Sequence, residues 1–141
     1  MNSLPIQALT REAFAPFGEV IMLEGAKHYP INAGTTERFH ELAHVDAAEK
    51  GGVPVTQSAD DEYLVVVAPE GEFDASQMKA FLATGFQGMS YARGVWQHPL
   101  IALHRVSDFL IVDRVGEGNN CDEIELDGQL VLITEACALA C

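Results

Sequence analysis

The sequence predicts one mainly β domain, built as a sandwich or barrel of short strands. Turn-forming residues recur at short intervals, and the apolar residues between them come in brief runs. The run Tyr63 to Ala68, with its consecutive valines, is typical of a buried strand. Near the end, Asp127-Gly128 separates two apolar segments and indicates a tight hairpin. The 141 residues fit a single domain, which we take as 1–141.

The first third of the chain mixes strands with one short helix. Thr10 is placed to cap a helix at 11–15, which Pro16 and Gly18 end. Around it the sequence predicts strands at 4–9 and 19–23, a loop at 25–34 and an extended segment at 38–45.

The middle of the chain holds a polar stretch and the one segment with a helical pattern. Residues 47–61 have little to bury and are expected to form a linker without regular structure. In 74–84, Asp74 can cap a helix, and Met78, Phe81 and Leu82 would share one face. After it the sequence predicts strands at 88–91, 95–98, 101–106, 109–113, 124–126 and 130–133.

Charge and composition limit the possible partners. The formal net charge of −13 would repel a phosphate backbone, so we expect no nucleic-acid partner. A carboxylate ligand would need local arginines, whose planar guanidinium pairs with it through two hydrogen bonds. No apolar run has the length of a membrane helix and no signal peptide is evident, so we expect a cytoplasmic protein without a membrane partner. The three cysteines lack metal-binding spacing and are expected to be reduced thiols.

The best candidate site lies at the corner formed by Arg93 and Gly94, between two predicted strands. Tyr91, Trp96 and His98 are close to it in sequence, and such groups converge on ligands at barrel mouths. The alternative is structural: Trp96 belongs to the core, Arg93 forms a surface ion pair and His98 ends a strand. Spacing alone somewhat favours the structural alternative.

Two further stretches carry polar residues that could act in a site. Arg38 and His40 are two apart, so a strand places them on one face, where one could hold a carboxylate and the other move a proton. Alternatively, Arg38 pairs with Glu37 or Glu41 and His40 is half-buried. The stretch 113–123 is rich in glycine and asparagine and reads best as a structural turn.

Together these stretches resemble the ureidoglycolate lyase family, and the matching pieces occur in the family's order. They are Leu9–Phe14, Phe17–Ile21, Ile31-Asn32 with Gly34, Arg38–His40 with Leu42-Ala43, Tyr63–Pro69, Gln87-Gly88, Tyr91 with Arg93–Trp96, His98-Pro99, Asp108–Leu110 and Asp113–Glu123.

The resemblance implies a cupin-like β-barrel that forms a homodimer and cleaves ureidoglycolate to glyoxylate and urea in allantoin and purine breakdown. It implies a carbon–nitrogen lyase of the amidine-lyase type with a divalent metal, nickel. On this resemblance His40, Tyr91 and His98 would be catalytic. Asn32, Arg38, Arg93 and Trp96 would bind substrate.

Two departures from the family pattern bear on this interpretation. The family normally carries more chain between Ala43 and Tyr63, including the first cupin motif, and here only the polar stretch 47–61 replaces it. We therefore expect a possibly incomplete barrel with one or two short helices outside it. The alternative function is a non-catalytic or truncated member that binds a small carboxylate.

The second departure concerns the second cupin motif. The family usually has histidine at the positions of Ala92 and Gln97, and Gln97 occupies the motif's ligand position. His98 is one residue further on and should point to the other face of the strand. We therefore expect little tightly bound metal.

Overall fold

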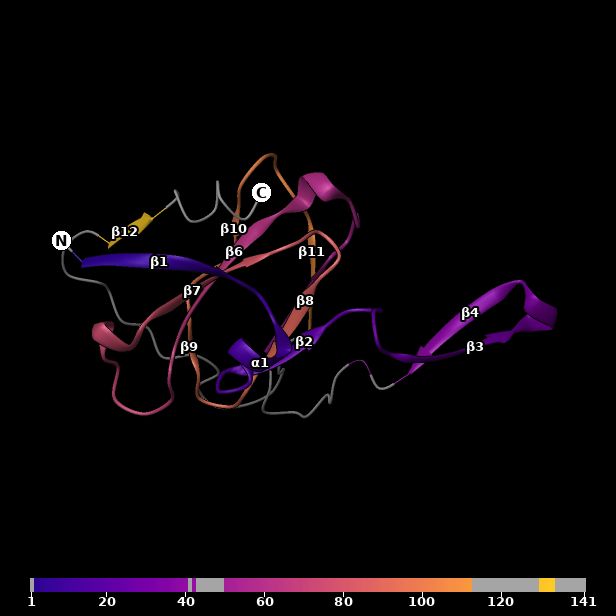
Figure 1. Cartoon of the computed structure of the whole chain (residues 1–141), viewed down its shortest axis with the longest axis horizontal. Helices are drawn as coiled ribbons and strands as arrows, with labels where there is room; N and C mark the ends of the chain where they lie inside the picture. The colour runs from indigo at the N-terminus through magenta and orange to yellow at the C-terminus, as the bar shows by residue number, and fades with distance from the viewer. Residues whose placement is uncertain (1, 41, 43–49, 113–129, 134–141) are drawn as a thin grey trace.

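The computed structural model describes residues 2–40, 42, 50–112 and 130–133. Its helices are short, and strands dominate the described chain (Figure 1). The strands are β1 (Asn2–Ala8), β2 (Gly18–Ile21), β3 (Lys27–Ile31), β4 (Thr36–His40), β5 (Lys50–Pro54), β6 (Tyr63–Ala68), β7 (Lys79–Ala83), β8 (Gly88–Tyr91), β9 (Trp96–Gln97), β10 (Ile101–Ala102), β11 (Phe109–Val112) and β12 (Leu130–Ile133). The helices are α1 (Arg11–Phe14) and the 3-10 turns η1 (Asn32–Gly34), η2 (Ala59–Asp61) and η3 (Ala75–Gln77).

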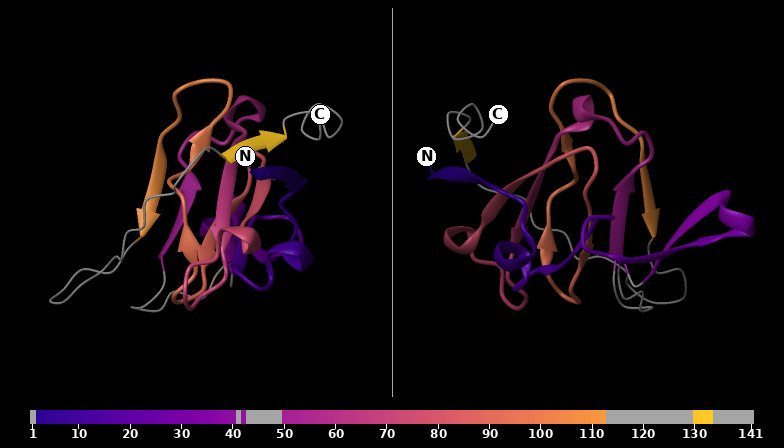
Figure 2. Two further views of the ribbon diagram at one scale, coloured as in Figure 1. Left: turned by 90° about the vertical axis from the view of Figure 1, so that its left-hand side faces the viewer. Right: turned by 45° about the vertical axis from the view of Figure 1, so that its right-hand side comes forward.

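Two larger sheets form the body, and a two-stranded hairpin projects from it (Figures 1 and 2). The six-stranded sheet has the order β10-β6-β7-β1-β12, with β9 also paired to β6. The four-stranded sheet has the order β11-β5-β8-β2, and β3 pairs with β4 in the hairpin. The mainly β prediction is confirmed, although the described strands form separate sheets and not one closed barrel.

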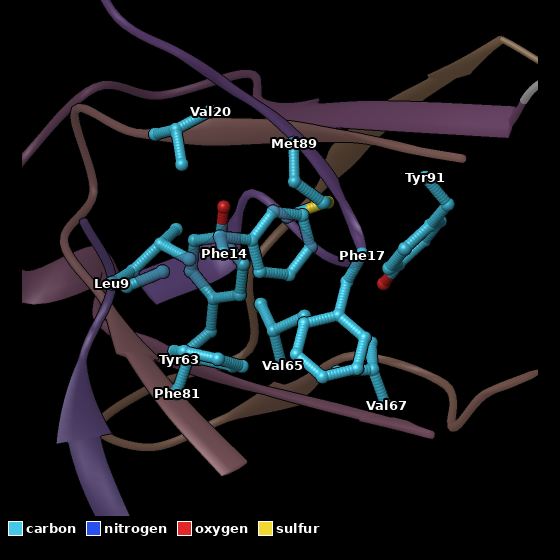
Figure 3. Close-up of a cluster of buried hydrophobic side chains, with 11 residues drawn as sticks. Leu9, Phe14, Phe17, Val20, Tyr63, Val65, Val67, Phe81, Met89 and Tyr91 are labelled. Carbon is cyan, nitrogen blue, oxygen red and sulfur yellow. The ribbon is translucent and has the colours of Figure 1, made fainter. Parts of the chain in front are cut away.

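An aromatic core joins the two sheets (Figure 3). Phe14 is fully buried at its centre, and its ring centroid lies 5.3 Å from that of Phe81 and 6.0 Å from that of Phe17. α1 delivers Phe14 to this position, and the side chain of Thr10 caps the helix by accepting a hydrogen bond from the backbone N–H of Ala13 at 3.1 Å. The predicted cap at Thr10 is therefore confirmed.

A second apolar cluster covers the other face of the six-stranded sheet. Residues alternate between the two clusters along β6: Val65 and Val67 face the aromatic core, whereas Leu64 and Val66 face the second cluster. This is why the run of valines is buried on both faces, as its composition predicts.

The helix predicted at 74–84 is wrong. Asp74 caps only the short turn η3, where its Oδ1 accepts from the backbone N–H of Ser76 at 2.9 Å. The following residues form β7, which pairs with β6 and β1 and is buried on both faces. Phe81 enters the aromatic core while Met78 and Leu82 enter the second cluster. A short apolar run fits either element, and pairing on both sides decides for the strand.

The loop predicted at 25–34 is also wrong, because most of it forms β3 and the tip of the hairpin. Asn32 and Ala33 at the tip have positive φ angles of 52° and 56°, which close the turn before β4. Both strands of this hairpin are largely exposed. They therefore lack the alternation of buried and exposed residues that would reveal them in the sequence.

The polar stretch 47–61 contains regular structure where a linker is predicted. β5 runs through it between β8 and β11, and η2 follows, while 47–49 lie outside the described residues. The glycines of β5 permit this packing, since a side-chain carbon at Gly51 would lie 2.7 Å from the carbonyl oxygen of Met89. The glycines thus mark a strand with crowded neighbours and not a flexible linker.

The other predicted strands are present with small changes of length. The segment predicted at 101–106 is reduced to β10, and 124–126 lies outside the described residues. None of the helices in the described part of the chain has the length and apolar character needed to cross a bilayer.

Candidate active site

A pocket of about 580 Å³ lies between α1, β2 and the base of the β3–β4 hairpin. Among the lining residues that the structure describes, four can carry charge: Arg11, Glu19, Lys27 and His40. The other described lining residues are apolar or small: Ala15, Gly18, Val20, Met22, Gly25, Ala26 and Leu42. The pocket therefore combines basic groups with walls that keep water away from part of a ligand.

His40 is held in this pocket in a defined orientation. It ends β4, opposite Lys27, and its ring stacks on that of Tyr29 with centroids 4.6 Å apart. Its Nε2 is buried and has no hydrogen-bond partner within the described part of the chain. A buried polar atom of this kind usually has a partner, so a bound ligand is a natural candidate for it.

Arg38 lies two residues before His40 on the same strand, directly opposite Tyr29. The predicted shared face of Arg38 and His40 is confirmed by this register, because side chains two apart on a strand point the same way. Arg38 is exposed and does not line the pocket.

Arg11 approaches the pocket from the first residue of α1. Its Nη2 donates a hydrogen bond to the carbonyl oxygen of Glu24 at 2.8 Å. A side-chain carbon at Gly25 would lie 3.7 Å from Nη1 of Arg11, so the guanidinium rests against this turn. Arg11, Lys27 and Glu19 have no predicted site role. An acidic chain needs local arginines to hold a carboxylate, but this requirement does not distinguish Arg11 from the other arginines, and only the fold places it in the pocket that His40 also lines.

Asn32 lies far from the pocket, at the tip of the hairpin. Four residue steps separate the last strand pair, Ile31 with Thr36, from the pair Lys27 with His40. At about 3.4 Å per step this is about 14 Å. The carbonyl oxygen of Asn32 accepts from the backbone and the hydroxyl of Thr35, so Asn32 organises the turn. Within one chain the structure does not bring Asn32 to His40.

Tyr91 ends β8 inside the aromatic core, and 6% of it is exposed. Burial raises the pKa of its hydroxyl well above the ordinary value. The hydroxyl therefore stays protonated at neutral pH and can donate a hydrogen bond, but it is a weaker acid than an exposed tyrosine and cannot act as a base. Tyr91 is the register partner of Gly18, which lines the pocket.

Arg93 follows β8 in a tight turn, as predicted. Gly94 has a φ of 81°, and the backbone N–H of Val95 donates to the carbonyl oxygen of Ala92 at 3.3 Å. The side chain of Arg93 is exposed. A side-chain carbon at Gly94 would lie 3.2 Å from Oε2 of Glu70, so a carboxylate already lies beside this turn.

Trp96 and His98 do not converge with Tyr91. Trp96 pairs with Ala68 and packs on the second apolar cluster, and its indole N–H donates to the carbonyl oxygen of Gly71 at 2.9 Å. His98 is exposed, and its Nδ1 is 2.8 Å from the carbonyl oxygen of Pro99. The predicted convergence at the Arg93 corner is therefore wrong for these two residues, because the six-stranded sheet separates Trp96 from the aromatic core.

The register of β9 also bears on whether this chain can hold the divalent metal that the family resemblance implies. Gln97 pairs with Val67 and shares its face towards the aromatic core, so strand alternation gives His98 the opposite direction. Within the described ranges, no group of three histidine, cysteine, aspartate or glutamate side chains could hold a metal ion. These residues do not fit a divalent metal centre. The stretch 113–123 lies outside the described residues.

Comparison with known proteins identifies the family. The model of the ureidoglycolate lyase family matches residues 1–59 and 53–133. The chain belongs to the ureidoglycolate lyase family. The ureidoglycolate lyase of Burkholderia cepacia is 49% identical over 165 residues, which cover 96% of this chain and 93% of that protein. That of Burkholderia mallei (strain NCTC 10229) is 46% identical over 164 residues, covering 96% of both chains. That of Pseudomonas putida (strain W619) is 39% identical over 162 residues, covering 94% of this chain and 97% of the relative.

This ureidoglycolate lyase family member is shorter than these relatives in its interior. The alignment with the Burkholderia cepacia protein runs over 165 residues, more than the 141 of this chain, so the relative contains chain that has no counterpart here. The two matched pieces of the family model meet at 53–59, where β5 ends and η2 begins. This position agrees with the predicted departure between Ala43 and Tyr63.

Proposed function

We propose that this chain is a ureidoglycolate lyase that converts ureidoglycolate to glyoxylate and urea. The observation that carries the proposal is the identity of nearly half of all aligned residues with a protein of that name, over nearly the full length of both chains. The family match on both sides of β5 adds support, because it includes the elements that form the pocket as well as the aromatic core.

The reaction is an elimination at a carbon that carries a hydroxyl, a carboxylate and a urea nitrogen. A base takes the hydroxyl proton, the oxygen forms a carbonyl, and the carbon–nitrogen bond breaks as the urea nitrogen gains a proton. His40 is our candidate for this proton transfer. It is a lining residue whose ring is oriented by Tyr29 and whose Nε2 has no partner among the described residues.

The structure supports the roles predicted for the other site residues to different extents. Burial raises the pKa of Tyr91, which rules out a base and also makes its hydroxyl a weaker acid, so its catalytic role remains a prediction. Arg38 and Arg93 remain predicted carboxylate-binding residues. Trp96 and His98 have structural contacts that explain their positions without a ligand.

We extend the proposal to the cellular setting that the family resemblance implies. The enzyme would act in allantoin breakdown in the cytoplasm, as a homodimer with a cupin-like fold, and would be classed with the amidine lyases. The family's divalent metal, nickel, has no fitting set of ligands within the described residues, so no step of the proposed reaction depends on it.

A second candidate function is binding of a small carboxylate without catalysis. Two observations favour this second function. The protein lacks an interior segment that the Burkholderia cepacia protein contains. It also has Ala92 and Gln97 at positions where the resemblance implies histidine. In this case the pocket would still bind an acid, but ureidoglycolate would not be cleaved.

Urea release from ureidoglycolate by the purified protein tests the proposal, with the uncatalysed decay of ureidoglycolate subtracted. We expect activity in the wild type and a loss of at least about a hundredfold in His40→Asn, the usual size of a general-base contribution. His104→Asn is the matched control, because His104 is an exposed histidine that contacts Glu62 outside the pocket. Equal activity in His40→Asn and wild type would refute the role of His40. Absence of urea release from the wild type, with acid binding retained, would favour the second candidate.

A further inference from the structure

We propose that Arg11 and Lys27 bind the carboxylate of the substrate in the pocket at the base of the hairpin. This makes the pocket a site for a small 2-hydroxy acid anion. The identification of the acid rests on the proposed function, whereas the preference for an anion rests on the pocket alone. The sequence had pointed instead to Arg38 and Arg93 for this role.

The charges around the pocket favour an anion, although the chain as a whole does not. The chain has eight lysines and arginines against 21 aspartates and glutamates, yet Arg11 and Lys27 both line this pocket. Among the lining residues that the structure describes, Glu19 is the acidic one, so Arg11 and Lys27 outnumber the acidic side chains of this described part of the pocket. A small acid repelled by the chain at long range would be attracted here at short range.

Arg11 is positioned before a ligand arrives. It begins a helix that is fixed by the cap at Thr10 and by the buried ring of Phe14. Its Nη2 is bonded to the carbonyl oxygen of Glu24. A guanidinium has five N–H donors, so most of them are left for a ligand after this bond. A fixed arginine loses little side-chain entropy on binding a carboxylate.

His40 supplies the second contact that a 2-hydroxy acid requires. A carboxylate held by Arg11 and Lys27 leaves the neighbouring hydroxyl within the same pocket, which His40 also lines. Such a hydroxyl would satisfy the buried Nε2 that has no partner in the described chain. The pocket thus offers basic groups for the acid and one nitrogen for the hydroxyl, and this combination selects for the class of ligand.

Arg93 is a weaker candidate for the carboxylate. Its side chain is exposed on a turn beside the carboxylate of Glu70. Arg11 and Lys27 are exposed as well, so what distinguishes Arg93 is the carboxylate of Glu70 beside its turn, which would repel an acid. None of the lining residues that the structure describes belongs to this turn.

Titration of the isotope-labelled protein with glycolate, followed by NMR, tests the proposal without using catalysis. Glycolate keeps the carboxylate and the adjacent hydroxyl, and glycolamide is its uncharged counterpart. We expect glycolate to shift the amide signals of Gly25, Ala26 and Lys27 in a saturable way, and glycolamide to leave them in place. Arg11→Gln should weaken glycolate binding by at least about tenfold, as expected for loss of a charge-assisted pair. Lys27→Gln should weaken it several-fold.

Lys79→Gln is the matched control, since it removes one positive charge from an exposed position of β7 outside the pocket. It should bind glycolate as the wild type does. Thermal unfolding of each variant separates loss of binding from loss of fold. Unchanged affinity in Arg11→Gln, equal binding of glycolamide, or no saturable binding by the wild type would each overturn the proposal. Binding that depends on Arg11 in a protein without lyase activity would support the site and refute only the proposed function.

Discussion

Replacing Tyr91 with phenylalanine should change how the stability of the protein depends on alkaline pH. Tyr91 is 6% exposed and Tyr63 fully buried, and burial raises the pKa of both hydroxyls. In the unfolded chain a tyrosine ionises near pH 10. The neutral phenols therefore support folding fully below about pH 10, and this contribution is lost as pH rises towards the folded pKa values.

The magnitude follows from the number of protons released on unfolding. Above about pH 10.5 each buried phenol keeps its proton in the folded state and loses it in the unfolded state. Each one lowers the free energy of unfolding by about 1.4 kcal/mol per pH unit, so the two together contribute about 2.7 kcal/mol per unit. Tyr91→Phe should remove half of this slope. Comparison with the wild type cancels the titration of lysines and cysteines, which both proteins share.

Urea unfolding followed by circular dichroism, at several values between about pH 9 and pH 11.5, measures this slope. Tyr29→Phe is the matched control, because Tyr29 is 41% exposed, and it should leave the slope unchanged. The same slope in Tyr91→Phe and wild type would refute the burial of this hydroxyl. Urea release by Tyr91→Phe at neutral pH then decides its role: a marked loss of rate supports a catalytic role of the hydroxyl, and an unchanged rate assigns Tyr91 to the core.

Three further predictions concern stability, metal and assembly. Arg105→Ala should lower the free energy of unfolding by about 2–3 kcal/mol in urea titrations, because Nε and Nη2 of Arg105 lie 2.8 Å from the carboxylate of Asp61, which is 2% exposed. Asp61→Asn in the same background should recover part of this loss, and a change below about 0.5 kcal/mol would contradict the argument. Purified protein should contain far less than one nickel or zinc ion per chain by mass spectrometry of the metals, also after Gln97→His, and a stoichiometric ion would overturn this expectation. Light scattering should show a dimer or larger species, because Leu110, Ile111 and Val112 on the edge strand β11 are about half exposed, and a monomer at high concentration would count against it.

The strands could be predicted where burial gives the local sequence a recognisable pattern of apolar residues. The segments 63–68 and 88–91 were located to the residue. The strand β3 could not be found in this way, and β4 was anticipated only in part by the extended segment predicted at 38–45, because neither strand has a buried face that would impose alternation. The strand β7 was taken for a helix for the opposite reason. Both of its faces are buried, and a continuous apolar run also contains the spacing of a helix.

The candidate site shows the same difference: features set by the local sequence could be predicted, and those set by the path of the whole chain could not. The shared face of Arg38 and His40 follows from the two-residue period of one strand, so the sequence could predict it. That Arg11 and His40 line one pocket depends on the path of the chain from α1 through β2 to the hairpin, which no local pattern encodes. Trp96 was misplaced because β9 joins the six-stranded sheet and turns Trp96 to the second apolar cluster, whereas Tyr91 ends β8 of the four-stranded sheet in the aromatic core.

The interior segment that this chain lacks need not remove the proposed site. All described lining residues of the pocket lie between Arg11 and Leu42, within the first matched piece of the family and before the two pieces meet at 53–59. The aromatic core that fixes α1 draws on β6, β7 and β8, from the second piece. Loss of chain at the junction therefore acts mainly on the four-stranded sheet, where β5 and β11 lie. A shortened family member can in this way keep a pocket for the acid while losing residues that other members use.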